Sequence, residues 1–345
     1  MRSRHAIALL VGIAPFVAGP AGAQEFKIQE AASLNDVPVA QLKPKMIVFT
    51  DRRKDEVADP DSGLLPFEDW AKTRPLQKAA LGLFPSYSEP TIIMVVDGFT
   101  KRHKEKLHLY VAEARVLLSK PPGRIDLARY TNLPFLSRLD GAIKHRQIAP
   151  TDVRTREQRY SHNQHPGRNW CEGRPGAVCI QSHYKLEGKL PIGIMLANKL
   201  REGVKKPIAD HLDFQSELAQ LSPAEIEQAG YGKLTGIDTP VTGALEQNIY
   251  YVNEVMQFGK LLAVFQQHPS DAGKTVATVY VALAVESNLF TKKREYANVP
   301  VLRNMVPAAV LAGNSSFNTG NSISAGLPKY ARNQIKAIAE VIEKE

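Results

Sequence analysis

The chain has 345 residues, of which 43% are hydrophobic and 23% are charged. These proportions are ordinary for a globular protein and exclude a largely disordered chain. The length suffices for one large domain or two ordinary ones and can bury a sizeable core. The formal net charge of +9 is a moderate excess, which favours acidic small molecules or anionic surfaces as partners over nucleic acid.

The first 23 residues predict a secretory signal peptide. Arg2 and Arg4 precede an apolar run at 6–17, and small residues follow at 21–23. This order is typical of a cleavable signal with an A-x-A cleavage site, and the run is too short to anchor the chain in a bilayer. We therefore expect cleavage after Ala23, a mature chain that starts at Gln24, and a periplasmic or secreted protein. No later apolar run is long enough to span a membrane, so we expect no transmembrane segment in the mature chain.

Residues 24–90 are rich in Pro, Asp and Lys and predict an irregular N-terminal segment packed on the core. This segment contains an apolar strand at 46–49 and a short helix at about 67–83. Residues 91–345 predict the main domain, which opens with a strand at 92–96.

The stretch at about 100–119 predicts an amphipathic helix. Leu107, Tyr110, Ala114 and Leu118 recur there at helical spacing. The basic residues at 101–108 are interpreted as a solvated helix face rather than a docking patch. One or two short helices are expected within 126–144, and alternating apolar residues predict a strand at 178–186.

A second helix is marked by its start signal. Ser222 precedes Pro223, and Glu225 completes a capping box, while Gly230 is placed to end the helix. Further strands are predicted at 249–255, 258–266 and 275–285, the last two as an antiparallel hairpin.

The chain closes with an amphipathic helix that opens at Pro328. Ala331, Ile335, Ile338 and Ile342 form its apolar face. Antiparallel strands followed by such a helix indicate an α+β fold, in which the C-terminal helix packs across an antiparallel sheet. A sheet curved around the helix, in a helix-grip-like arrangement, would enclose an apolar cavity.

Only two cysteines are present, Cys171 and Cys179. Gly173, Pro175 and Gly176 favour a turn between them, and an exported chain permits a disulfide, which we predict. A catalytic cysteine served by a nearby histidine is the alternative.

The polar stretch around the cysteines supplies the first candidate site. His162, His165 and His183 could share a divalent metal such as zinc, because imidazole is a common zinc ligand. No other cofactor is predicted. The alternative is a polar loop pinned by the disulfide, because the spacing on a Pro/Gly-containing loop does not enforce a common face.

Two further sets are candidate ligand-binding residues. Arginines beside an aromatic residue could grip a carboxylate or phosphate, or could equally form a solvent-facing strand; they are Arg154, Arg156, Arg168 and Trp170. The Gly-, Asn- and Ser-rich stretch at 313–326 could present backbone N–H groups to an anion, or be a surface loop; its candidates are Asn314, Ser316 and Asn318.

Short catalytic patterns are rejected. Ser182 and Lys185 match S-x-x-K, but that motif needs the start of a helix and this one lies in a predicted strand. Asp51 follows an apolar strand, as phosphotransfer aspartates do, but Arg53 stands where a second acid would be required. No catalytic residue is therefore assigned.

Three functions are carried forward. The first is an exported binding or accessory protein for a small amphipathic or anionic ligand of the envelope. The second is a periplasmic hydrolase, possibly metal-dependent, that uses the His162, His165 and His183 region, and the third is a structural envelope protein. Convergence of the three histidines would favour the second, and a fully packed core beneath the final helix would weaken the first.

Overall fold

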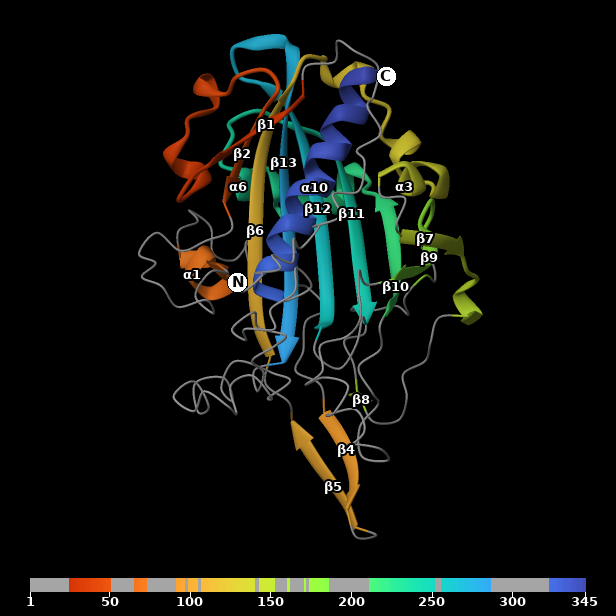
Figure 1. The fold of residues 1–345 in the computed structure, drawn as a ribbon. Coiled ribbons are helices and arrows are strands. Elements are labelled where there is room, and N and C mark those ends of the chain that lie inside the picture. Colours follow the sequence, from red (N-terminus) through yellow and green to blue (C-terminus); the bar gives the residue numbers. More distant parts are fainter. Residues whose placement is uncertain are drawn as a thin grey trace, which may run out of the picture.

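The structure is a computed structural model (Figure 1). It describes residues 25–50, 65–72, 91–96, 99–104, 107–139, 143–152, 160–161, 171, 174–185, 211–251, 256–286 and 323–345.

A ten-stranded sheet dominates the molecule, in the order β1-β2-β6-β13-β12-β11-β10-β9-β7, with β3 beside β6. Its strands are β1 (Lys27–Glu30), β2 (Met46–Thr50), β3 (Leu65–Pro66), β6 (Leu107–Leu118), β7 (Ile143–Gln147), β9 (Val178–Lys185), β10 (His211–Gln220), β11 (Val241–Tyr251), β12 (Met256–His268) and β13 (Asp271–Glu286). β1 and β2 are parallel and the other pairs are antiparallel, so the sheet is mixed rather than purely antiparallel. Its described strands do not close into a ring, and a mostly sheet structure with few helices fits the α+β class.

A second sheet has three strands, in the order β5-β4-β8. They are β4 (Thr91–Val96), β5 (Phe99–Lys104) and β8 (Tyr160–Ser161). Figure 1 shows the β4–β5 hairpin beyond one end of the large sheet.

The predicted helix at 100–119 is wrong, because this stretch forms β5 and β6. β6 lies inside the sheet between β2 and β13, and both of its faces are covered. A strand buried on both faces carries apolar residues at successive positions, and these produce helical spacing by chance. Its polar residues are buried too: Glu113 Oε2 accepts from Trp70 Nε1 at 2.8 Å, and Arg115 Nη2 donates to the Thr235 carbonyl at 2.8 Å.

One face of the large sheet carries the C-terminal helix α10 (Ile323–Lys344), which runs obliquely over the strands in Figure 1. The helix begins at Ile323, earlier than Pro328. Ile335, Ala339 and Ile342 are at most 3% exposed and share a hydrophobic cluster with the inward residues of β6, β12 and β13. α3 (Leu133–Leu139) adds Phe135 and Leu136 to the same cluster.

The opposite face is covered by α1 (Phe67–Lys72), α5 (Pro223–Ala229) and α6 (Tyr231–Thr235). Trp70 and Leu234 pack there with Leu262 and Tyr280 of the sheet. The predicted capping box is confirmed, since Glu225 N donates to Ser222 Oγ and Ser222 N donates to Glu225 Oε2. Gly230 ends the helix in the left-handed conformation with φ of 70°, which glycine adopts without a Cβ penalty.

Most other predicted elements are confirmed, with shifted boundaries. The strands expected at 46–49, 92–96 and 178–186 are β2, β4 and β9, and β12 and β13 form the expected hairpin. Residues 126–144 hold a 3-10 helix and α3, but end in β7. Short 3-10 helices complete the described elements, at η1 (Leu34–Asp36), η2 (Val39–Gln41), η3 (Pro122–Arg124), η4 (Leu127–Tyr130) and η5 (Pro150–Asp152). Within the described ranges, no helix is both long and apolar enough to cross a membrane.

Candidate functional site

The disulfide predicted from the sequence is confirmed. Cys171 and Cys179 are bonded, with their Cα atoms 5.7 Å apart. The bond is consistent with an oxidising, extracytoplasmic compartment, where disulfides persist. The alternative of a catalytic cysteine is wrong, because both sulfurs are in the bond and no free thiol remains.

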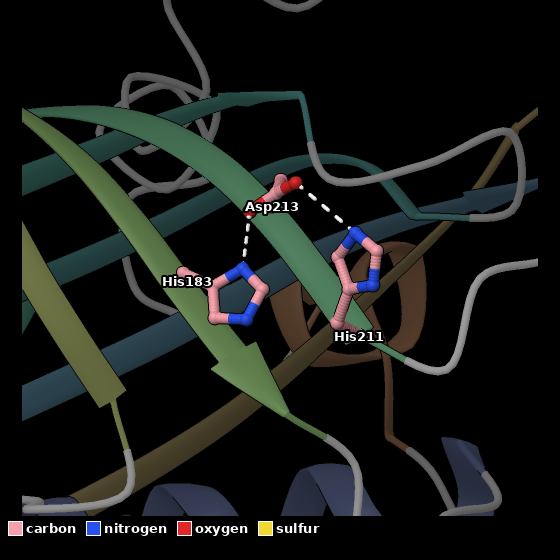
Figure 2. Close-up of side chains that lie close together, drawn as sticks. All are labelled: His183, His211 and Asp213. Carbon is pink, nitrogen blue, oxygen red and sulfur yellow. Dashed lines mark hydrogen bonds and ion pairs between the residues drawn. The ribbon is translucent and has the colours of Figure 1, made fainter.

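A cluster of two histidines and one aspartate lies on β9 and β10, next to the edge strand β7, and Figure 2 shows its side chains turned toward one another. His183 Nδ1 is 2.8 Å from Asp213 Oδ1, and His211 Nε2 is 3.2 Å from Asp213 Oδ2. The two imidazole rings lie 4.9 Å apart between centroids. The aspartate carboxylate therefore bridges the two rings.

Strand register explains this convergence. His183 on β9 is directly opposite Asp213 on β10, and residues opposite each other in an antiparallel pair point to the same face. His211 precedes Asp213 by two positions, which places it on that face as well. The pairing of β9 with β10 therefore brings His183 to His211 and Asp213, which lie much later in the chain.

The cluster has the composition of a metal site. Each residue offers one ligand atom, and all three atoms lie within 4.8 Å of one another. The side chains are between 31% and 45% exposed, so an ion could reach them from solvent. Two imidazole nitrogens and one carboxylate oxygen form a ligand set that suits zinc and other divalent transition metals.

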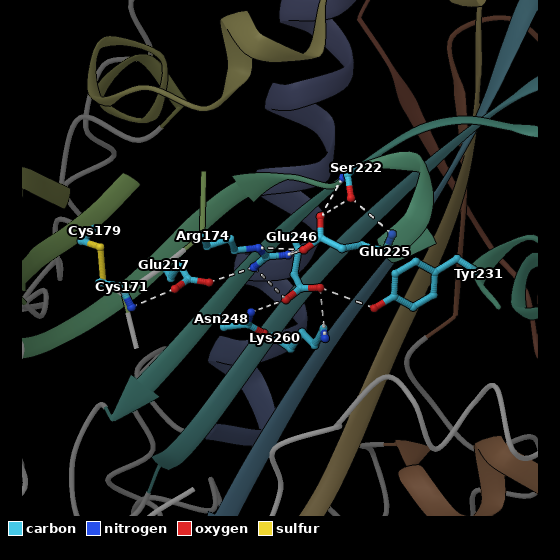
Figure 3. A network of polar contacts seen from close by, with 10 residues as sticks. All are labelled: Cys171, Arg174, Cys179, Glu217, Ser222, Glu225, Tyr231, Glu246, Asn248 and Lys260. Atoms are coloured by element: carbon cyan, nitrogen blue, oxygen red, sulfur yellow. Dashed lines mark hydrogen bonds and ion pairs between the residues drawn. A yellow bond between two sulfur atoms is a disulfide. The ribbon is translucent and has the colours of Figure 1, made fainter. Parts of the chain in front are cut away.

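A second polar cluster is buried on the same face of the sheet, away from α10 (Figure 3). Arg174 Nη1 lies 2.8 Å from Glu217 Oε1 and 3.5 Å from Glu246 Oε1. Lys260 Nζ lies 3.4 Å from Glu246 Oε2. Glu225, nearer the surface, bonds Arg174 at 3.1 Å. Two buried cations thus face two buried carboxylates.

Charge pairing opposes the desolvation of these groups. Burial alone would raise the pKa of Glu246, but Lys260, Arg174 and the Asn248 amide lower it to about 2. Burial lowers the pKa of Lys260, and the attraction of Glu246 only partly offsets it. Burial together with Glu246 raises the pKa of the Tyr231 hydroxyl well above its ordinary value. The Glu246 carboxylate is therefore held in its charged form inside the core.

The disulfide and this buried cluster are joined. The Cys171 amide donates to Glu217 Oε2 at 2.9 Å, and Glu217 is fully buried. Cys171 has φ of 64°, a left-handed conformation that is uncommon for a residue with a side chain. Because each cation of the cluster lies within 3.5 Å of a carboxylate oxygen, we interpret the cluster as structural rather than as a ligand site.

Ser182, rejected above as a catalytic serine, lies on the opposite face of β9. Its Oγ is 2.8 Å from His145 Nδ1, a serine–histidine contact that resembles part of a hydrolase site. Ser182 is fully buried, however, and a nucleophile must reach its substrate. In this structure the contact joins β9 to β7 inside the core.

The remaining sequence candidates lie outside the described residues. They are His162, His165, Arg154, Arg156, Arg168, Trp170, Asn314, Ser316 and Asn318. Of the three predicted metal ligands, only His183 is placed, and its neighbours are His211 and Asp213.

A small hollow lies beside η3 and η4, near the start of β11 and the ends of β10 and β12. Its volume is about 160 Å³, below the roughly 300–1,000 Å³ of typical small-molecule sites. It is lined by Pro122, Ile125, Asp126, Leu127, Gln220, Thr242 and Phe265.

No protein-family model and no curated protein sequence matches this chain. Among solved structures it is similar to the ZhuI aromatase/cyclase from Streptomyces sp. R1128, with a TM-score of 0.32 and 10% identity. The match covers 69% of this chain and 93% of that chain. A TM-score this low supports no conclusion about fold or function.

His211 and Asp213 were missed from the sequence, although a local signal exists. The H-x-D spacing puts both side chains on one face of any strand that contains it. Its pairing with His183 depends on the β9–β10 register, which carries no local signature. Arg174, Glu217, Glu246 and Lys260 were missed as well, because charged residues are usually exposed.

Proposed function

We propose that the protein is an exported binding protein that holds one divalent transition metal, zinc in the first instance, at His183, His211 and Asp213. The observation that carries the proposal is the bridging position of the Asp213 carboxylate between two imidazole nitrogens. The signal peptide expected at residues 1–23 and the disulfide support an extracytoplasmic location for this binding.

The spacing of the ligand atoms suits a tetrahedral zinc ion. Zinc binds nitrogen and carboxylate oxygen at about 2.0–2.2 Å, so two of its ligand atoms lie about 3.3–3.6 Å apart. His183 Nδ1 lies 2.8 Å from Asp213 Oδ1 and His211 Nε2 lies 3.2 Å from Asp213 Oδ2, so each nitrogen is already near this distance from one carboxylate oxygen. Small side-chain rotations would bring the two histidine nitrogens, within 4.8 Å of each other, into range.

The ligand chemistry also selects the class of metal. Calcium and magnesium bind oxygen ligands, usually six or more for calcium. Two imidazoles with a single carboxylate instead favour zinc, copper or nickel. His162 and His165 remain candidates for a fourth ligand.

The metal-dependent hydrolase is a weaker alternative. Zinc hydrolases combine an open coordination position with a pocket and a positioned acid or base. The described residues supply the open position, but the cluster lies on a half-exposed face rather than in a described pocket. Binding therefore explains the geometry with fewer additional groups.

The fold that we propose is helix-grip-like, with α10 packed across the sheet. Ile335, Ala339 and Ile342 fill the space beneath the C-terminal half of α10, so an amphipathic ligand would not fit there. A site for such a ligand would have to lie nearer Ile323, where α10 starts. Native mass spectrometry of the protein purified from its own compartment would detect a retained lipid or metal.

Zinc titration of the full chain, followed by calorimetry, tests the metal site. We expect one zinc ion per chain and an affinity at least about 100-fold weaker in H183A, H211A or D213A, since even indirect partners of a metal contribute 10–100-fold. H145A is the matched control, because His145 lies on the adjacent strand but faces the other side. Unchanged affinity in all three variants would contradict the proposal.

A double variant, H162A/H165A, separates this site from the one predicted from sequence neighbours. Loss of zinc binding in the double variant alone would move the site to that stretch. Weaker zinc binding both in H162A/H165A and in the variants of His183, His211 and Asp213 would identify a site that the two parts of the chain share.

A further inference from the structure

The metal site proposed above would have room for a fourth ligand beside the three described residues. Three described residues offer one ligand atom each, and zinc in proteins is usually four-coordinate. All three side chains are partly exposed, so the remaining position would face solvent. The surroundings of that position decide what would occupy it.

The neighbouring edge strand β7 brings two cations to this face. Lys144 is directly opposite His183, and Arg146 is opposite Gln181, two positions along β9. Side chains directly opposite each other on an antiparallel pair have Cβ atoms about 4.5–5.5 Å apart. Both basic residues are exposed, and within the described part of the chain neither makes an ion pair.

We propose that the open position of the metal binds an oxyanion, the carboxylate or phosphate group of a small ligand, with Lys144 and Arg146 as its counter-charges. This inference rests on the proposed function. Neutral imidazoles and one carboxylate leave a divalent ion with a net positive charge, and the two side chains add to it. Arg146 can bind two oxygens of one anion, and Lys144 acts as a point charge beside the metal.

The competing occupant of the position is water. Water alone would make the site a zinc centre without a bound anion, and Lys144 and Arg146 would then be solvated residues of an edge strand, where lysine is common. The two cases differ in whether added anions change the coordination of the metal.

The experiment uses the full chain loaded with cobalt(II), whose visible absorption reports its ligands. Acetate and inorganic phosphate are titrated separately, and we expect each to change the spectrum in a saturable way. K144A and R146A should each weaken anion binding by about three- to tenfold, as expected for one charge pair near a surface. K233A is the control, because Lys233 is exposed on α6, away from the β7 edge in Figure 1.

The outcomes separate the two proposals. Absence of a cobalt spectrum overturns both the metal site and the oxyanion. A cobalt spectrum that neither anion changes, or a response equal in the native chain, K144A and R146A, overturns the oxyanion site and leaves the metal site standing. The ratio of the acetate and phosphate affinities shows which oxyanion is preferred.

Discussion

Replacing Arg174 with methionine tests whether the buried charges beside the disulfide stabilise the fold. The Arg174 guanidinium lies 2.8 Å from Glu217 and 3.5 Å from Glu246, and both carboxylates are at most 5% exposed. Methionine retains much of the apolar stem but removes the charge and the hydrogen-bond donors.

The expected loss follows from the burial of the carboxylates. Removing one partner of a buried ion pair costs about 3–5 kcal/mol, because the other charge stays desolvated without compensation. The bond to Glu225 adds little, since that side chain is 41% exposed. We therefore expect R174M to lower the free energy of unfolding by about 3–5 kcal/mol.

Urea unfolding with the disulfide intact measures this loss as a shift in midpoint at constant slope. K233M, an exposed lysine-to-methionine change, should stay within about 0.5 kcal/mol of the native chain. The double variant R174M/E217Q should be less destabilised than the sum of its single changes, because the unpaired charge is removed. A loss below about 1 kcal/mol in R174M would refute the argument, since a surface pair costs no more than that.

Other changes probe the disulfide, the helix and the pH dependence. The C171S/C179S variant should lose about 2–3 kcal/mol in urea unfolding, because the sequence separation of 8 closes only a short loop; an equal midpoint for the native and variant chains would contradict this. I342A should cost about 2–5 kcal/mol, since Ile342 is 1% exposed, whereas K344A should be near neutral; a small loss in I342A would mean that α10 is not held by this face. The pKa of Glu246 is lowered to about 2 in the fold from 4.5. Its contribution of about 3 kcal/mol should be complete above pH 5 and disappear as the pH falls toward 2. E246Q should show a shallower loss between pH 6 and pH 3, and parallel curves would argue against the low pKa.

The hairpin of β12 and β13 could be predicted because its signals are local. Two runs rich in apolar and β-branched residues are separated by a turn at Pro269 and Ser270. β6 could not be predicted as a strand from its own sequence, because its environment is set by distant segments. Glu113 and Arg115 are of residue types that are usually exposed, and only Trp70 and Thr235, brought in by the fold, show that they are buried.

Part of the candidate metal site could likewise be predicted from the sequence, and part could not. His183 was singled out from composition, and its predicted partners were its neighbours in sequence. Its neighbours in space come from β10, and the register that pairs His183 with Asp213 is a tertiary property. The H-x-D spacing fixes the relation of His211 to Asp213 but does not reveal the strand that they face.

The register of β9 and β10 links the two polar clusters. Successive pairs of opposite residues on one face of these two strands carry different kinds of side chain. In order along β10 they are His183 with Asp213, Gln181 with Gln215, and Cys179 with Glu217. The middle pair is itself bonded, with Gln215 Nε2 donating to Gln181 Oε1 at 2.9 Å.

A slip of one residue along β10 would exchange the two faces of that strand. Glu217 would then move to the α10 side, where Leu218 now packs, and would lose Arg174 and the Cys171 amide. An unpaired carboxylate in that apolar core would cost several kcal/mol, so the buried charges select one register even if they add little net stability. The same register places Asp213 opposite His183. The buried charges around Glu217 therefore help to position the exposed cluster of His183, His211 and Asp213.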